Sequence, residues 1–345
     1  MIRTCSRPLR SLSAALGTLA AAAWSLCFLP RICCGQESSG PSPPPLKSVA
    51  ELVKLDVTVL DRHGGFVSGL EQKRFRVLDN GGEQPIQFFA PVEAPAHVLV
   101  LIETSPAVYL IHDEHLFAAY ALLDGLAPDD QVALATYDQA PRAVLGFTSD
   151  KAEVASALGG IHYNIGAAQL SFYDSVSAIL DWEGSQTGKR ALLLLTTGLD
   201  SSSPARWDAL VQKLRGEDVV IYAVALGGVL RGPPGKKSKP PKAPTESTVG
   251  ESMSWANADG ALMSLATITG GRAYFPESPD RFVSMYREIS SALRHQYVLG
   301  IAPRHDGQFH SLSVQILDSN GKPVPTDVKR AEYRVSTRQG YRAPQ

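Results

Sequence analysis

The residues best suited to chemistry stand at the end of an apolar run, "VLVLIETSPA", which starts at Val98 and ends at Ala107. The run stops at Glu103, and hydroxyl groups follow at once at Thr104 and Ser105. A buried strand that ends in such a loop presents oxygen ligands, which hard cations such as Mg²⁺ prefer. The first question for this chain is whether the loop holds a metal ion.

Motifs for other kinds of chemistry are weak. The stretch "GSQTGKR" (184–190) resembles a phosphate-binding loop, but it has one residue too few between its glycines and no hydroxyl after Lys189. There is no Gly-x-Ser-x-Gly elbow for a serine hydrolase. His112 and His115 are spaced to share one helical face, but no clear third zinc ligand accompanies them. These patterns favour a protein without catalytic activity.

The first 35 residues have the pattern of a secretory signal peptide. A basic start precedes an apolar, alanine-rich segment from Leu12 to Leu29, and the small residues Cys33 and Gly35 stand before a cut at Gln36. An uncleaved membrane anchor is the alternative, because the apolar segment is near the lower length limit of a spanning helix. Cleavage predicts an exported protein, periplasmic or extracellular, that is not inserted in a membrane.

Composition excludes several further kinds of site and partner. All cysteines of the chain precede Gln36, so a processed protein has no disulfide, Cys-ligated metal or cysteine nucleophile. The formal net charge of -1 gives no general attraction to nucleic acid. With 345 residues and 44% hydrophobic content, the chain is long enough to bury a full core.

The two ends of the remaining chain have a β pattern. Residues 36–49 are rich in Pro, Ser and Gly and are predicted to form a disordered linker. Apolar residues alternate in "KLDVTVLD", and glycine turns punctuate the segment 50–92. Alternation returns over 296–345 in "HSLSVQILD". Because a few strands alone are marginally stable, we expect both segments to form one antiparallel β module.

The middle of the chain, 96–295, has a different spacing of apolar residues. Unbroken apolar runs at 98–102, 191–197 and 219–226 are typical of parallel strands covered on both faces, and helical patterns separate them. This order predicts a doubly wound, mainly parallel α/β domain inserted into the β module, with ligands beyond the carboxyl ends of its strands. Residues 228–250 are predicted to be a flexible Pro/Lys-rich loop without core-forming residues.

Several motifs carry a family resemblance over residues 50–343. They are "FRVLDNGGEQPIQFF", "FTSDKAEVASAL", "FYDSVSAIL", "LATITGGRAYF" and "HQYVLGIAP". Together with the acidic loop, they resemble the von Willebrand factor A (VWFA)-related domain proteins of the secreted acidobacterial type. The resemblance implies an exported bacterial protein with a Rossmann-like VWFA fold, a protein-binding role and no catalytic activity.

Metal-binding VWFA domains carry Asp-x-Ser-x-Ser in the first loop, and this chain departs from that pattern. Glu103 stands for the Asp, Ser105 matches the first Ser, and Ala107 replaces the second. The extra methylene of Glu103 displaces its oxygens, and Ala107 offers no oxygen, so a site that demands near-ideal octahedral geometry is weakened.

The other two ligand loops of the family pattern depart as well. Leu170 takes the position of a Thr, with Ser171 next to it, and Thr197 replaces an acidic residue, with Asp200 close behind. We therefore expect a degenerate metal-ion-dependent adhesion site and no cofactor. Weak Mg²⁺ binding is the alternative, because several of the side chains in these loops still carry oxygen atoms. The remaining oxygen candidates are Glu103, Ser105, Ser171 and Asp200.

These observations predict an exported, non-enzymatic protein-binding or adhesion-type module that works without a metal. The candidates for partner contact on the loop face are Tyr109, Phe172, Tyr173 and Thr197. Phe172 and Tyr173 have an equal alternative as core residues in the first turn of a helix. The alternative functions are a hydrolase or other enzyme on the same fold, or an envelope assembly or structural protein that contacts partners through its β module. The expected partner is another protein.

Overall fold

The computed structural model describes residues 52–62, 65–92, 95–166, 169–183, 189–231, 254–325 and 333–345. Residues Val49–Gln345 form one compact unit. The predicted signal peptide, the linker at 36–49 and most of the predicted loop at 228–250 lie outside the described residues. Across the parts of the chain that are described, no helix combines the length and apolar character needed to span a membrane.

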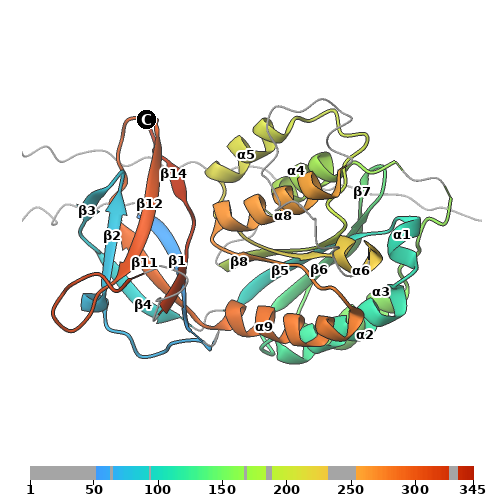
Figure 1. Ribbon diagram of the computed structural model, residues 1–345, viewed down its shortest axis with the longest axis horizontal. Helices are drawn as coiled ribbons and strands as arrows, with labels where there is room; N and C mark the ends of the chain where they lie inside the picture. Colours follow the sequence, from blue (N-terminus) through green and yellow to red (C-terminus); the bar gives the residue numbers. More distant parts are fainter. Residues whose placement is uncertain are drawn as a thin grey trace, which may run out of the picture. The chain divides into compact units, whose positions relative to one another are not determined.

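A six-stranded sheet forms the centre of the α/β domain (Figure 1). All neighbouring strands in it are parallel except the edge strand β7, which runs antiparallel to β6. In spatial order the strands are β10 (Arg272–Tyr274), β9 (Val220–Ala225), β8 (Lys189–Thr196), β5 (Ala96–Glu103), β6 (Gln131–Tyr137) and β7 (Pro141–Thr148). The order changes direction between β5 and β8, so the loops that follow these two strands diverge at a topological switch point.

Helices cover both faces of this sheet (Figure 1). On one side lie α2 (His112–Gly125), α3 (Lys151–Gly159) and α9 (Phe282–Arg294), and on the other lie α4 (Phe172–Glu183), α5 (Trp207–Gly216) and α8 (Trp255–Thr269). Side chains of β5 alternate between the two layers: Val98 and Val100 pack toward α2 and α9, whereas Leu99 and Leu101 pack toward α4 and α8. Burial on both faces explains the unbroken apolar runs of the sequence.

The two ends of the described chain combine into an antiparallel β module of two four-stranded sheets. One has the order β13 (Tyr333–Ser336), β1 (Val53–Asp61), β11 (Gln296–Ile301) and β4 (Phe88–Val92). The other has the order β14 (Gly340–Arg342), β12 (Phe309–Ile316), β2 (Phe75–Asp79) and β3 (Gly82–Gln84). A shared core joins Leu55 and Val57 of β1 to Val77 of β2 and Val314 of β12.

The predicted fold class is confirmed by this pairing. Strand β1 lies between β11 and β13, so the N-terminal segment depends on the C-terminal segment for its hydrogen bonds, as expected. The α/β domain is therefore inserted into a β module built from both flanks, and the order and direction of its strands are those of a VWFA-like sheet.

One sequence prediction needs correction. Residues 228–231 do not belong to a flexible loop, because they continue the short helix α6 (Gly227–Arg231), and Val229 and Leu230 pack against the core. The three serines before Pro204 lie outside α5, which starts after Arg206 and whose N-cap makes no side-chain hydrogen bond. These serines hold a neighbouring loop, as described below.

Candidate functional site

Three strands deliver polar side chains to one place at the carboxyl edge of the sheet. Glu103 is the last residue of β5 and pairs in register with Tyr137, the last residue of β6. Thr196 ends β8, whose Leu195 pairs with Ile102 of β5. Since side chains alternate along a strand, Glu103, Tyr137 and Thr196 all follow the parity that faces α4 and α8. Strand register alone brings these groups together.

The carboxylate of Glu103 accepts hydrogen bonds from this chain's own donors on both oxygens. Oε1 accepts from the Ser105 hydroxyl at 2.6 Å. Oε2 accepts from the Tyr137 hydroxyl at 3.1 Å, the Thr196 hydroxyl at 2.9 Å, and the amide and hydroxyl of Thr197, both at 2.7 Å. We refer to Glu103, Ser105, Tyr137, Thr196 and Thr197 as the Glu103 cluster.

The Glu103 cluster is closed off from solvent. Glu103, Tyr137, Thr196 and Thr197 are each 0% exposed, and Ser105 is 3% exposed. Burial, followed by the negative charge of Glu103, raises the pKa of Tyr137 well above its usual value, so the phenol stays protonated and can donate. A buried carboxylate is costly unless it is hydrogen-bonded, and here the donors at the ends of β6 and β8 satisfy it.

The glutamate's extra methylene has a structural consequence. It carries the carboxylate from the end of β5 toward donors of both neighbouring strands, so Glu103 ties the ends of β5, β6 and β8 together. The Ser105 hydroxyl also caps the short helix α1 (Pro106–Tyr109) by accepting from the amide of Val108 at 3.4 Å. The acidic loop is thus fixed by internal hydrogen bonds.

The other two predicted oxygen candidates bond to neighbouring loops. The Ser171 hydroxyl lies 2.8 Å from that of Ser202. Asp200 accepts from the Tyr173 amide at 2.9 Å and from the Ser203 amide at 3.1 Å and its hydroxyl at 2.5 Å. Asp200 is also near enough to Tyr137 for its charge to contribute to the raised pKa of that phenol, after burial and Glu103.

The loop before α4 and the loop after β8 are hydrogen-bonded to each other. Leu170 receives hydrogen bonds on its carbonyl from the amides of Ser201 and Ser202, at 2.8 and 3.1 Å, and its own amide donates to the Ser201 hydroxyl at 2.8 Å. Asp174 accepts from the Ala205 amide at 3.0 Å. The serine run that follows β8 therefore serves to hold the other loop in place.

The structure places three of the predicted partner-contact residues in the interior. Phe172 and Tyr173, in the first turn of α4, are 0% and 7% exposed and pack in the core, where their rings lie near Tyr137 and Trp207. Thr197 is 0% exposed within the Glu103 cluster. They are therefore unavailable as surface anchors, and the alternative of core packing is correct for both aromatic residues. Tyr109 is different, with 44% of its surface exposed.

An exposed patch surrounds Tyr109 at this edge. The Tyr109 ring stacks on His112 at 4.7 Å between centroids and lies 6.0 Å from the ring of Tyr163. Leu110 and Ile165 are 76% and 75% exposed. The amide of Asn164, next to Ile165, donates to the Thr104 carbonyl at 2.8 Å, so the two loops lie side by side. We refer to Tyr109, Leu110, His112, Tyr163 and Ile165 as the Tyr109 patch.

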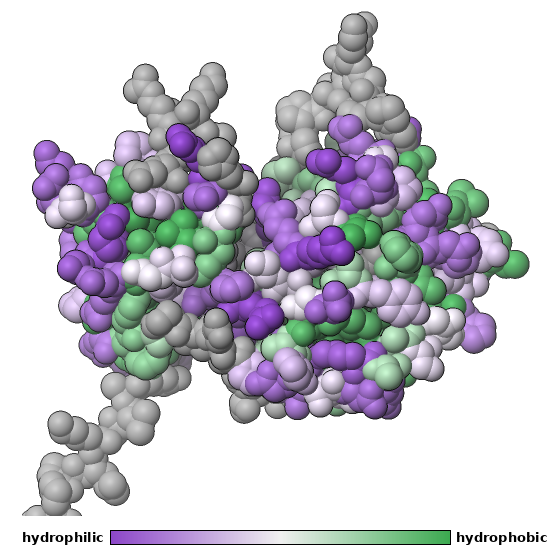
Figure 2. All heavy atoms as spheres, turned by 90° about the horizontal axis from the view of Figure 1, so that it is seen from below, coloured by the Kyte–Doolittle hydropathy of each residue, from purple (hydrophilic) through white to green (hydrophobic). Residues whose placement is uncertain are grey.

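Sequence reasoning missed most of this patch because its members come from separate loops. In Figure 2 hydrophobic side chains gather toward the end of the molecule where Figure 1 places α1 and α2. Burial and then the charge of Asp113 raise the pKa of Tyr163 to about 12, so its hydroxyl stays neutral. His112 and His115 share the spacing of a helical face, but zinc binding is not expected of them. His112 Nδ1 donates to the Tyr109 carbonyl at 2.6 Å, and Nε2 lies 3.2 Å from Asp113. Only the backbone of His115 is described.

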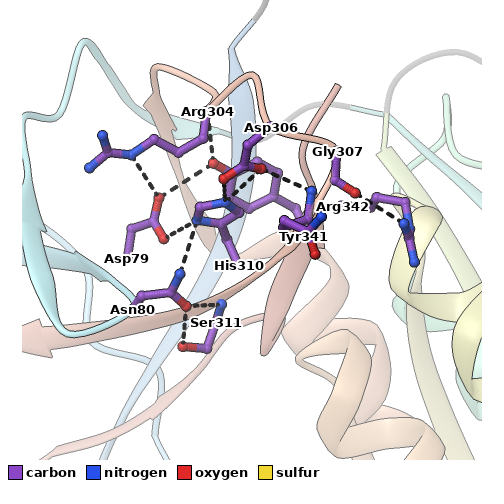
Figure 3. A network of polar contacts seen from close by, with 10 residues as sticks. Asp79, Asn80, Arg304, Asp306, Gly307, His310, Ser311, Tyr341 and Arg342 are labelled. Atoms are coloured by element: carbon purple, nitrogen blue, oxygen red, sulfur yellow. Dashed lines mark hydrogen bonds and ion pairs between the residues drawn. The ribbon is translucent and has the colours of Figure 1, made fainter. Parts of the chain in front are cut away.

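A second polar cluster lies in the β module (Figure 3). His310 of β12 is buried, with Nδ1 at 2.8 Å from Asp79 Oδ1 and Nε2 at 3.0 Å from Asp306 Oδ2. Tyr341 stacks on the imidazole and donates to Asp79 at 3.4 Å. Burial acts to lower the pKa of His310, but the hydrogen bonds and charges of Asp79 and Asp306 outweigh it and raise that pKa.

Within the described residues, no group of three or more His, Cys, Asp or Glu side chains is placed to hold a metal ion. The oxygen atoms at the carboxyl edge of the sheet are arranged in the hydrogen bonds given above. The Glu103 cluster therefore holds a buried carboxylate between loops that are fixed by hydrogen bonds. The Tyr109 patch is exposed next to these loops.

Comparisons with known proteins give structural likenesses only. No family model matches the chain, and no curated protein matches it. A von Willebrand factor type A protein from Catenulispora acidiphila is 12% identical with a TM-score of 0.42, and the alignment covers 86% of this chain and 75% of that one. The vWF domain of the type V pili tip protein Mfa5 from Porphyromonas gingivalis is 10% identical with a TM-score of 0.42, covering 59% of this chain and 96% of that one.

A third solved structure is an aerotolerance-related membrane protein from Bacteroides fragilis. It is 15% identical with a TM-score of 0.41, and the alignment covers 57% of this chain and 98% of that one. These values are too low to transfer any function. The VWFA-like fold of this chain is defined by its own strand order, strand direction and helix layers.

Proposed function

We propose that the chain is an exported, non-enzymatic protein-binding module that engages its partner through the Tyr109 patch without a metal ion. The observation that carries this proposal is the contrast at one edge of the sheet. Acidic and hydroxyl groups there are buried and paired with each other, whereas Tyr109, Leu110 and Ile165 are exposed beside them. Apolar and aromatic side chains at loop tips are the usual anchors of protein interfaces.

The donor set supports binding without a metal. A divalent ion needs oxygens with free lone pairs pointing at one centre. Both oxygens of Glu103 accept hydrogen bonds, the Ser105 hydroxyl is directed to Glu103, and Asp200 accepts bonds on both oxygens. Leu170 is buried at the position where metal-binding relatives have a Thr. These residues do not fit the ion that the resemblance implies, because an ion would have to displace several internal hydrogen bonds.

His310, a buried histidine of the β module, supports a role without catalysis. A general base needs one free ring nitrogen within reach of the group it activates. Both nitrogens of His310 face carboxylates, Asp79 on one side and Asp306 on the other. Neither nitrogen is directed at a serine, threonine or cysteine nucleophile. A binding role through the rigid loop edge is therefore the function that the geometry favours.

Site-specific photo-crosslinking tests the proposal. A benzophenone side chain placed at position 110 should crosslink to an envelope protein of the source bacterium, and the same product should form with EDTA and with millimolar Mg²⁺. Position 263 on α8 is the matched control, since Met263 is also exposed, at 41%. Adding Tyr109→Ala and Ile165→Ser should weaken the crosslink by about tenfold, the usual effect of removing interface anchors.

Two results would count against the proposal. Equal crosslinking from positions 110 and 263 would show contact that is not specific to the patch. A product that disappears with EDTA and returns with Mg²⁺ would show that the acidic loop still uses a metal. In both cases circular dichroism of the variants establishes that the fold is retained.

A further inference from the structure

A cavity of about 290 Å³ lies where the β module meets the α/β domain, away from the Tyr109 patch. Leu60 of β1 and Phe66 line it from the β module. Tyr222 of β9 and Tyr274 of β10 line it from the central sheet, and Ala292 lines it from α9. Its walls are therefore mainly apolar and aromatic, and its volume is near the lower end of the range for small-molecule sites.

The aromatic wall on the β module side is held in place. The ring of Phe66 lies 4.9 Å from that of His295 and 5.9 Å from that of Tyr297. Tyr297 donates through its hydroxyl to the Val67 carbonyl at 2.9 Å and accepts from the Leu70 amide at 3.0 Å. Because Phe66 packs near two other rings and the Tyr297 hydroxyl makes two hydrogen bonds, the wall is preformed, which lowers the entropy cost of binding.

Gly270 and Gly271, which directly follow α8, also line the cavity. A Cβ on Gly271 would lie 2.0 Å from the Ile221 carbonyl oxygen, and a Cβ on Gly270, where φ is +83°, would lie 2.4 Å from the carbonyl carbon of Thr337. The backbone therefore approaches closely there, and a hydrogen bond from Gln339 to Ile268 at 2.9 Å fixes the contact between the modules. These backbone contacts fix the position of the β module against the α/β domain at this wall of the cavity.

The rim of the cavity carries an excess of positive charge. Arg272 forms an ion pair with Glu288 and lies 5.1 Å above the ring of Tyr274, so its charge is already balanced. Arg287 also lines the cavity and is exposed, and within the described part of the chain its guanidinium has no carboxylate partner. An aromatic cavity with one unbalanced arginine at its mouth is complementary to an aromatic anion.

We propose that this cavity is a binding site for a small aromatic carboxylate. The ring system lies against Phe66, Tyr222 and Tyr274, and the carboxylate is held at the mouth by Arg287. This site is separate from the proposed protein-binding patch and would make the junction of the two modules responsive to a small molecule. The ligand would stabilise the folded chain by RT ln(1 + [L]/Kd), because it binds the folded state only.

Calorimetric titration of the full chain with 2-naphthoate tests this site, with 2-naphthamide as the uncharged analogue of the same shape. We expect saturable binding of 2-naphthoate and weaker binding of the amide. Arg287→Ala should weaken 2-naphthoate binding by about threefold, as expected for an exposed ion pair, and leave the amide unaffected. Arg281→Ala is the matched control, since Arg281 is exposed at the start of the same helix and does not line the cavity.

Filling the cavity provides the second arm of the test. Ala292→Phe should leave the melting temperature close to that of the wild type and weaken 2-naphthoate binding by about tenfold or more, a loss of one pKd unit. Ser291→Phe, at an exposed position that lines the same cavity, gives the same reading if the first variant does not fold. Absence of saturable binding, or unchanged binding in a folded filled variant, overturns the site. Equal affinity for the amide overturns its preference for a carboxylate.

Discussion

At the residue scale, one methylene group distinguishes Glu103 from the aspartate of the metal-binding VWFA pattern that the sequence resembles. The longer side chain places its carboxylate among the hydroxyls of Tyr137, Thr196 and Thr197. The replacement of an acidic residue by Thr197 is compatible with this, because the Thr197 hydroxyl donates to Glu103 where a second carboxylate would repel it. The two departures from the family pattern are thus chemically matched to each other.

This matching predicts that Glu103 stabilises the fold. Glu103→Gln presents an amide nitrogen to groups that are donors themselves and leaves buried hydroxyls without an acceptor, so we expect a loss of about 2 to 4 kcal/mol. Urea unfolding at neutral pH measures it. Glu153→Gln on the exposed face of α3 is the control and should change the free energy of unfolding by less than about 0.5 kcal/mol. Equal stability of the wild type and Glu103→Gln would contradict the proposed tie between the strands.

At the element scale, the His310 cluster joins β2, β12 and β14 of one sheet. Asp79 belongs to β2, Tyr341 to β14, and Asp306 to the loop before β12. Arg304 lies 3.8 Å from Asp79 and adds positive charge on its far side. The amide of Asn80 lies 3.2 Å from His310 Nδ1, but the carboxylate of Asp79 is closer. An imidazolium between two carboxylates satisfies both ring nitrogens as donors.

The raised pKa of His310 predicts a pH dependence with a definite sign. The folded state binds the proton more tightly than the unfolded state, so the stabilisation is fully present below the usual histidine pKa of about 6.5 and is lost as the pH rises through the folded-state pKa. Urea unfolding of the wild type and His310→Gln between pH 5 and 9 measures it. The difference in stability should shrink at high pH. A difference that grows with pH would show that the neutral ring is the favoured form.

At the scale of the whole molecule, the β module depends on both ends of the described chain. Strand β11 lies between β1 and β4, and β12 lies between β14 and β2. Strand β11 therefore sits between two N-terminal strands, and β12 sits between an N-terminal strand and β14. Leu55 and Val57 are 0% exposed only because β11 and β12 complete the core around them.

Deleting residues 297–345 should expose the N-terminal strands. Since a pair or trio of strands is marginally stable alone, we expect trypsin to cut within 52–92 of the shortened chain while the same bonds stay protected in the full chain. Mass spectrometry of the fragments gives the result. The bonds after Lys189 and Arg190 at the start of β8 serve as an internal control for the α/β domain. If 52–92 proved equally resistant in both chains, the N-terminal segment would be an independent unit.

Much of the architecture was predictable from the sequence because it depends on local patterns. Unbroken apolar runs determined the parallel strands, and alternation in "KLDVTVLD" and "HSLSVQILD" determined the strands of the β module. The position of Glu103 at a strand end also followed from the sequence. The departures from the metal-loop pattern at Ala107 and Leu170 are also visible in the sequence.

Only the tertiary structure decided what those side chains contact. The register of β5 with β6 and β8 sets Tyr137 and Thr196 around Glu103, and no single segment encodes a register between strands. Phe172 and Tyr173 are buried because α5 and the loop after β8 cover them. Both of these elements come later in the chain. The Tyr109 patch, the His310 cluster and the cavity at the junction also join distant segments. Local sequence patterns report the period and polarity of one element, whereas contacts between elements arise only when the elements pack.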